Sequence, residues 1–171
     1  MVATNENDIL DRFFKTGEYA LGDVFRTNSP AMDIQVASNF ERFLFYHFDE
    51  DANRLCGFME EFAQSGKASV DGPLPSDIFL SCSTSQSDTE ETIAEINSKY
   101  GYVIDPHTAV GIRAARSIVT EDPIVCIATA HPAKFPDALG RAIGYRPSHA
   151  RLSGLRGLPE RKQEVPSDEL E

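Results

Sequence analysis

Three polar side chains stand where apolar segments of the chain turn into predicted helices. Thr129 ends the apolar run Pro123–Thr129. Asp105 and His107 follow the shorter apolar piece Tyr102–Ile104. In open α/β sheets, ligands bind beyond the carboxyl ends of the strands. A threonine hydroxyl there suits the ring nitrogen of a heteroaromatic cofactor, because a neutral hydroxyl leaves that nitrogen uncharged. His107 could transfer protons or contact an anion at a helix N-terminus.

Each of these residues also has a purely structural interpretation. Thr129 could cap the following helix, and Asp105 could be an N-cap beside a His107 that is merely hydrogen-bonded. His131 presents the same choice. Lys134 could act as a nucleophile if it were desolvated, but a lysine at a helix start is typical of an exposed cation. The spacing of the His and Cys residues predicts no metal site, and no glycine-rich phosphate loop is visible.

Helical periodicity and turn residues predict the elements that must position these side chains. We expect the end of a strand at Val2–Thr4 and a helix from an Asn7 N-cap to Gly17, followed by irregular chain over residues 18–37. Further helices are predicted after a Ser38–Glu41 capping box, from Asp51 to Ser65, after a Ser87–Glu90 capping box to Gly101, from Pro106 to about Ile118, and from Phe135 to Ile143 with Gly144 as its stop.

The apolar run Pro123–Thr129 predicts a central parallel strand that helices cover on both faces. A lone strand cannot satisfy its backbone groups. Either Ile78–Leu80 and Tyr102–Ile104 pair with it, or other sequence supplies most of the sheet, and we favour the latter. The fold class is α/β, helix-rich, with few parallel strands. We expect one body over residues 1–145, with a surface excursion at 67–87, and an irregular tail over 146–171.

Composition limits the function classes. The chain has 171 residues, a net charge of −11 and 41% hydrophobic residues, which is enough for a core. A pI near 4.8 argues against nucleic-acid binding, and no apolar run approaches the ~20 residues of a membrane helix. Three cysteines without a CxxC pair favour a reducing cytoplasm. We expect Cys56 and Cys126 to be buried.

Several segments resemble the C-terminal part of threonine synthase, a pyridoxal-phosphate enzyme of the tryptophan-synthase-like group, also called fold type II. They occur in the family's order over residues 3 to about 138. The segments are Ala3–Leu10, Thr16–Tyr19, Ser29–Val36, Ser38–Arg42, Asp105–Val110 and Thr129–Phe135.

The resemblance implies that the complete enzyme converts O-phosphohomoserine and water to threonine and phosphate, with pyridoxal phosphate as the electron sink. It implies that Thr129 hydrogen-bonds the pyridine nitrogen, and that Asp105 and His107 belong to the wall of the substrate pocket. The family's cofactor-binding lysine and Gly-Asn-Phe-Gly phosphate loop have no counterpart here, and Lys134 does not match that lysine. We therefore expect this chain to be inactive alone, and no catalytic residue is assigned to it.

Two alternative functions remain open. The chain could be a non-catalytic interaction module derived from the enzyme, or part of a related pyridoxal-phosphate phospho-lyase that does not hydrate its product. Because a portion of a larger sheet exposes strand edges and apolar faces, we also expect the chain to associate with itself.

Overall fold

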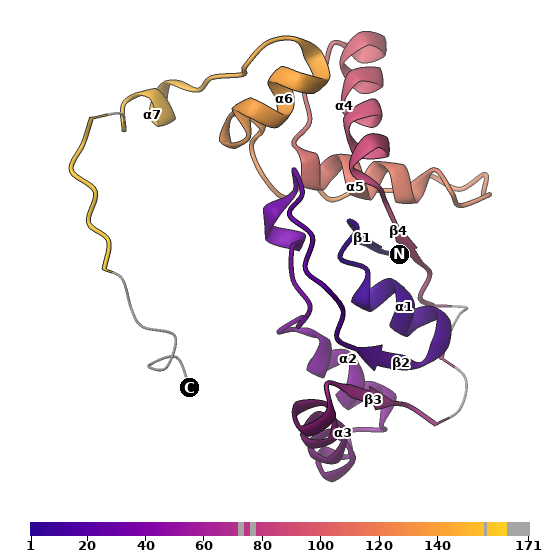
Figure 1. Cartoon of the computed structure of the whole chain (residues 1–171). Helices are drawn as coiled ribbons and strands as arrows, with labels where there is room; N and C mark the ends of the chain where they lie inside the picture. Colours follow the sequence, from indigo (N-terminus) through magenta and orange to yellow (C-terminus); the bar gives the residue numbers. More distant parts are fainter. Residues whose placement is uncertain (72–73, 76–77, 156, 164–171) are drawn as a thin grey trace.

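The structure is a computed structural model and describes residues 1–71, 74–75, 78–155 and 157–163 (Figure 1). Its strands are short and form two separate pairs. β1 and β4 are parallel, with Ala3 opposite Cys82, and β2 and β3 are antiparallel. The elements are, in chain order, β1 (Val2–Thr4), α1 (Ile9–Thr16), β2 (Glu18–Ala20), η1 (Pro30–Met32), α2 (Phe40–His47), α3 (Ala52–Ser65), β3 (Lys67–Ser69), β4 (Ser81–Ser83), α4 (Gln86–Tyr100), α5 (Pro106–Ala115), η2 (Pro132–Lys134), α6 (Pro136–Ile143) and α7 (Ala150–Ser153).

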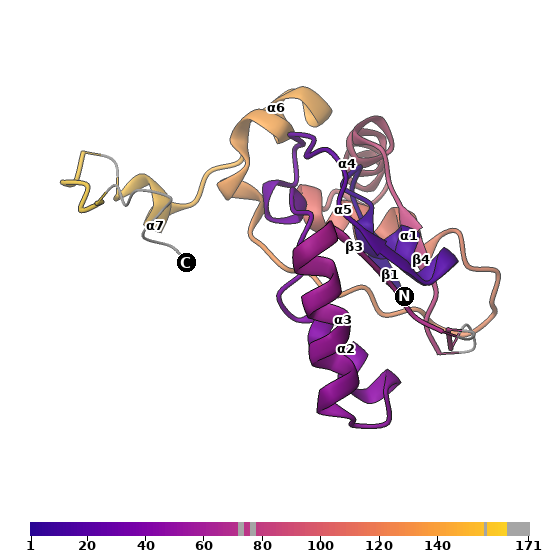
Figure 2. The same cartoon turned by 60° about the horizontal axis from the view of Figure 1, so that its bottom comes forward.

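An aromatic core holds α1, β2, α2 and α3 together. Phe13 is fully buried. Its ring meets Phe40 edge-on at 4.6 Å and Tyr19 edge-on at 6.2 Å between ring centroids. Phe62 of α3 lies 4.6 Å from Tyr19, and α2 and α3 lie side by side at the end of the molecule away from α6 (Figures 1 and 2). Helical spacing of aromatic residues therefore produces one continuous apolar cluster.

A second apolar cluster lies among α4, α5 and α6. Ile93 of α4 and Leu139 of α6 are fully buried there with Ala109 of α5. The small side chain of Ala109 permits close packing of α5 against its neighbours. The β1–β4 pair contacts both α1 and α5 and so connects the two clusters (Figure 1). This architecture is α/β, with few parallel strands and many helices, as the sequence predicts.

Glycines end four of the helices at the predicted positions. Gly17, Gly66, Gly101 and Gly144 follow α1, α3, α4 and α6, and all have positive φ. Gly17 has a φ of 77°, and a Cβ at this position would lie 3.4 Å from the Val70 side chain. The positive φ at residue 17 disfavours any residue with a side chain, independently of the contact with Val70.

Three helix starts differ from prediction. The N-cap of α1 is Asp8, not Asn7, whose side chain bonds elsewhere. The Ser38–Glu41 box does not form, because Asn39 holds the cap position without a side-chain bond. The cap of α4 is Ser85, which accepts from the backbone N–H of Asp88, rather than Ser87. Tertiary contacts thus select among neighbouring residues that could all cap.

The predicted central strand Pro123–Thr129 is wrong for this structure. The segment has no regular secondary structure, and Val125 and Ile127 are 81% and 75% exposed. Neither Ile78–Leu80 nor Tyr102–Ile104 pairs with it among the described residues. Without a neighbouring strand its N–H and C=O groups have no ladder to join, which agrees with the expectation that other sequence supplies most of the sheet.

Several smaller expectations are also wrong. Cys56 and Cys126, which were expected to be buried, are exposed. The segment predicted as irregular, 18–37, contains β2 and η1. β3 and β4 fall within the surface excursion predicted over 67–87, which stays a prediction. No helix of the described residues is long and apolar enough to cross a membrane. The predicted division at residue 145 stays a prediction.

Replacing Phe13 with alanine tests the aromatic core. We expect Phe13→Ala to lower the free energy of unfolding by about 3–5 kcal/mol, because the cavity would lie at the contact of several rings. Urea unfolding followed by circular dichroism measures the change. Phe25→Ala is the matched control, since Phe25 is 51% exposed, and a loss of similar size there would contradict the assignment.

Exposure of the Pro123–Thr129 segment predicts self-association. Burial of Val125 and Ile127 between copies would remove apolar surface from water. We expect sedimentation velocity to show dimers or larger species, and Val125→Ser combined with Ile127→Ser to reduce them. A monomer at high concentration in the unmodified chain would disprove this expectation.

Candidate functional site

The N-terminus of α5 organises the candidate site. Asp105 is its N-cap, with φ −80° and ψ 162°, and Pro106 is at the first helical position. Proline removes no helical hydrogen bond at this position, because the N–H of the first helical residue has no acceptor within the helix. Asp105, Pro106 and His107 are all buried, so the polar groups of this turn must find partners within the protein.

The carboxylate of Asp105 accepts hydrogen bonds from three donors. Oδ1 accepts from the backbone N–H of His107 at 3.0 Å and lies 2.9 Å from His107 Nδ1. Oδ2 accepts a short bond from the Thr108 hydroxyl. Burial alone would raise the pKa of Asp105, but the bonds from His107 and Thr108 outweigh it, so the pKa lies below its ordinary value. Asp105 is therefore a charged anchor.

His107 connects α5 to a distant loop. Its Nε2 accepts a bond from the backbone N–H of Ala31 at 3.2 Å, across 76 positions of the sequence. Nε2 therefore carries no proton, and Nδ1 carries the proton that it donates to Asp105. The ring also packs 4.9 Å from Phe135. Because both ring nitrogens are engaged within the protein, this geometry favours the structural interpretation of His107 over proton transfer or anion binding.

Thr129 lies beside the same helix start. Its backbone N–H points to Thr108 Oγ1 at 3.4 Å, while the residue is exposed. It does not cap the helix that follows. That position belongs to His131, whose ring accepts from the N–H of Ala133 at 3.1 Å. Through Thr108, the structure thus brings together Asp105, His107 and Thr129, the three residues singled out from the sequence.

A partly buried polar network holds the loop that carries Ala31. Asp33 Oδ1 accepts from the side-chain amides of Asn5 at 2.7 Å and Asn7 at 3.2 Å, and from the Thr27 hydroxyl at 2.7 Å. Asp33 Oδ2 accepts from the Thr27 N–H at 2.9 Å. Asn7 also bonds both the N–H and the C=O of Phe25. These bonds connect residues 25–33 to the end of β1.

Thr108 and the Asn5–Asn7–Asp33 network were not identified as site residues from the sequence. Asn5 and Asn7 directly follow a buried strand, and Asp33 follows a proline turn. Asn and Asp in such positions bond backbone groups and hold irregular chain. The presence of these Asn and Asp residues indicates that irregular chain is held by side-chain bonds. It does not indicate that the chain they hold is the 25–33 loop.

The other candidate cations lie outside this cluster. Lys134 is exposed. It lines an open surface pocket together with His131, His149, Arg151 and Leu152. The rings of His131 and His149 lie 5.0 Å apart. Over the part of the chain that the structure describes, no three His, Cys, Asp or Glu side chains gather as a metal site would require.

Comparison with known proteins adds independent information. The family model described as threonine synthase, C-terminal, matches residues 108–171. Threonine synthase of Pseudomonas aeruginosa is 40% identical over 175 residues, which cover 98% of this chain and 37% of that protein. Threonine synthase of Corynebacterium glutamicum is 38% identical over 180 residues, with the same coverage of 98% and 37%. The chain thus spans little more than a third of the length of these relatives.

A solved structure agrees with both the fold and the resemblance. The crystal structure of pyridoxal-phosphate-bound threonine synthase from Brucella melitensis superposes with a TM-score of 0.82 at 42% identity. The match covers 88% of this chain and 33% of that one. The fold is therefore a part of the fold-type II architecture, as expected from the sequence.

The Asp105 cluster predicts a pH-dependent loss of stability in Asp105→Asn. Asparagine still caps a helix, so the variant loses mainly the charge, at a cost of about 1–3 kcal/mol at pH 7. Because the folded pKa lies below the unfolded value of about 3.9, this contribution is complete above the unfolded pKa. It disappears as the pH falls through the folded pKa.

Urea unfolding at pH 7, 5 and 3 checks this expectation. The stability difference between the parent chain and Asp105→Asn should shrink at the lowest pH. Asp137→Asn serves as the control, since the Asp137 side chain is 72% exposed in its ion pair and should change stability little. A pH-independent difference would show that the Asp105 charge contributes nothing.

The polar network predicts that Asp33 holds the 25–33 loop. We expect Asp33→Ala to speed amide exchange at Phe25, Thr27 and Ala31 by about tenfold or more. The Thr27 N–H would lose its acceptor directly, and the loop would lose its bonds to Asn5 and Asn7. Hydrogen exchange measured by NMR follows each amide. Asp23→Ala is a control in the same loop, where the side chain is exposed. Equal effects of both variants would contradict the network's role.

Proposed function

Because this chain is similar over nearly its whole length to the C-terminal part of threonine synthases, we propose that it forms that part of such an enzyme. The proposed reaction converts O-phosphohomoserine and water to threonine and phosphate in the cytoplasm. The cofactor of the complete enzyme is pyridoxal phosphate, which stabilises carbanions formed on the bound amino acid. The chain is proposed to contribute cofactor contacts rather than the covalent attachment.

One observation supports this function best. Three segments that resemble the family, Ser29–Val36, Asp105–Val110 and Thr129–Phe135, meet at the N-terminus of α5. The bonds from Ala31 to His107 and from Thr129 to Thr108 make the contacts.

The residues present fit a pyridine ring at Thr129. The residue is exposed and therefore accessible, while its backbone is tied to a buried helix start through Thr108. A neutral hydroxyl can donate one hydrogen bond to a ring nitrogen without protonating it. Asp105 orients Thr108, and His107 holds Ala31 in place, so these residues would act as positioning residues for the wall of the site.

The lysines of the described chain do not fit covalent attachment. Each of them is exposed, Lys134 included, and none lies in the buried cluster at Asp105. A lysine that reacts with a carbonyl cofactor needs desolvation or a neighbouring cation to lower its pKa. The attachment would therefore come from the portion of the enzyme that precedes this sequence in the relatives.

A chimera tests the proposed function. The C-terminal portion of the Pseudomonas aeruginosa threonine synthase would be replaced by this chain, and phosphate release from O-phosphohomoserine measured. We expect the chimera to be active. Thr129→Val should lower its kcat by about fivefold or more, which corresponds to the loss of one hydrogen bond worth about 1 kcal/mol. Thr129→Ser keeps the hydroxyl and should retain most activity.

The chimera has controls for folding. The thermal midpoints of Thr129→Val and of the parent chimera are compared, and a loss of activity is assigned to the missing hydroxyl only where the two midpoints agree. An inactive but folded chimera would contradict the proposed function. Equal activity of the Val and Ser variants would contradict only the role of Thr129.

The isolated chain should not form an imine with the cofactor. We expect no absorbance band typical of a lysine–pyridoxal imine when the purified chain is mixed with pyridoxal phosphate, because its lysines are exposed and unactivated. Absorbance spectroscopy measures this directly. A stable band that one lysine substitution abolishes would overturn the expectation.

A further inference from the structure

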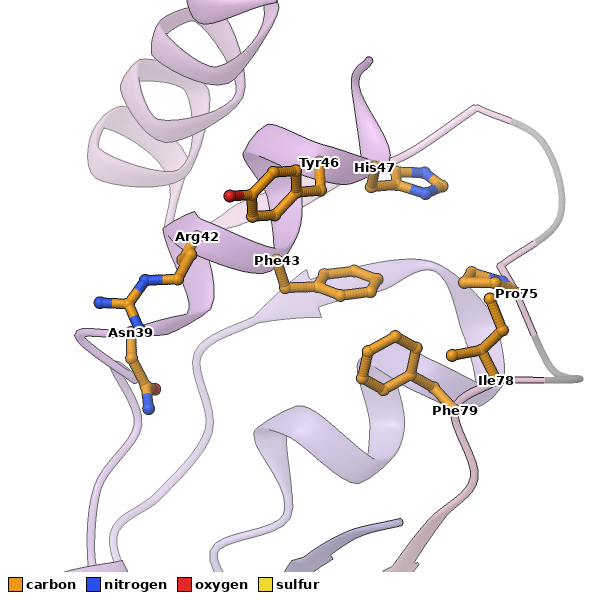
Figure 3. A pocket seen from close by; sticks show the side chains of 8 residues that line it. All are labelled: Asn39, Arg42, Phe43, Tyr46, His47, Pro75, Ile78 and Phe79. Carbon is orange, nitrogen blue, oxygen red and sulfur yellow. The ribbon is translucent and has the colours of Figure 1, made fainter. Parts of the chain in front are cut away.

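An open pocket lies on the face of α2 that is turned toward Pro75, Ile78 and Phe79 (Figure 3). Its volume is about 440 Å³, which is within the range of small-molecule sites. It shares no residue with the cluster at Asp105. Its lining consists of Asn39, Arg42, Phe43, Tyr46, His47, Pro75, Ile78 and Phe79.

One end of the pocket is an aromatic wall anchored in the core. Phe43 meets Phe79 edge-on at 5.0 Å, and Phe79 stacks on Phe14 at 5.4 Å between ring centroids. Phe43 and Phe14 pack against the buried cluster around Phe13. The wall is therefore held in position without a ligand. Ile78 extends it and is 69% exposed, leaving apolar surface for a ligand to cover.

The opposite end of the pocket is polar. Figure 3 shows the guanidinium of Arg42 beside the amide of Asn39, away from Pro75 and Ile78. The Tyr46 hydroxyl points toward the same end (Figure 3). No ion pair within the described ranges involves Arg42. A planar guanidinium binds a carboxylate through two parallel hydrogen bonds.

We propose that this pocket binds a small amphiphilic carboxylate with an aromatic ring. The ring would lie against Phe43, Phe79 and Ile78, and the carboxylate would pair with Arg42 and accept from Asn39. Arg42 argues for the carboxylate, because no ion pair within the described ranges occupies its guanidinium. The aromatic wall argues for the ring, because it offers apolar surface on which a ring can pack.

Ligand-observed NMR with three probes tests the proposal on the full 171-residue chain. The probes are 3-phenylpropionate, 3-phenylpropanol, which lacks the carboxylate, and propionate, which lacks the ring. We expect saturable binding of 3-phenylpropionate, with the other two at least about tenfold weaker, because each lacks one of the two contacts. Equal binding of the acid and the alcohol would overturn the proposal, and so would no binding of the acid.

Variants locate the binding. Arg42→Gln should weaken 3-phenylpropionate by about tenfold and leave 3-phenylpropanol unchanged, while Ile78→Ser should weaken both. Both side chains are exposed, so neither variant should unfold the chain. Arg26→Gln, another exposed arginine, is the matched control. If Arg26→Gln weakens binding as much as Arg42→Gln, recognition is non-specific and the proposal is wrong.

Sedimentation velocity distinguishes a second possible occupant. If Ile78→Ser lowers self-association of the chain and the acid does not bind, a second copy of the chain occupies the pocket. That result would also overturn the proposal. The experiment does not depend on the activity of the chimera, so it can fail while the proposed function stands.

Discussion

The buried carboxylate of Asp105 is the interaction on which the candidate site depends. It satisfies the N–H of His107, the imidazole Nδ1 and the Thr108 hydroxyl at once. A buried charge is stable only when several donors compensate for its lost hydration. These donors belong to His107, which contacts Ala31, and to Thr108, which contacts Thr129. The bonds that stabilise the buried charge therefore also hold the start of α5 to the segments that carry Ala31 and Thr129.

The same principle explains the 25–33 loop. Much of this segment has no helix or strand, so side chains rather than a backbone ladder must satisfy part of its backbone groups. Asn7 does so at Phe25, and Asp33 does so at Thr27. An irregular segment held by buried side chains can present a backbone N–H at a defined point, which here is the N–H of Ala31. A mobile loop could not do this.

The apolar surfaces show where this chain differs from a self-sufficient domain. Its two buried clusters are complete around α1–α3 and around α4–α6. Val125 and Ile127, by contrast, face solvent in a segment with strand-like composition. The relatives are much longer than this chain, which agrees with a segment that lacks neighbouring strands. Composition indicates that such a segment should be buried, and only the presence of a partner decides whether it is.

Residues close to one another in the sequence were sufficient to predict much of the secondary structure. The helix-ending glycines, the helical spacing of apolar residues and the Asp105–Pro106 start predicted most helices, because these features depend on residues within a few positions of one another. Residue type and position after apolar segments singled out Thr129, Asp105 and His107, and the family resemblance implied a role for each of them.

Tertiary structure decided the contacts that no local rule contains. The bond from Ala31 to His107 spans 76 positions. Asn7, predicted as the cap of α1, bonds instead to the backbone of Phe25, 18 positions away. Whether Pro123–Thr129 forms a strand depends on a neighbouring strand, and no strand pairs with it among the described residues. Local sequence determines which groups need partners, whereas only the folded chain determines which partners are within reach.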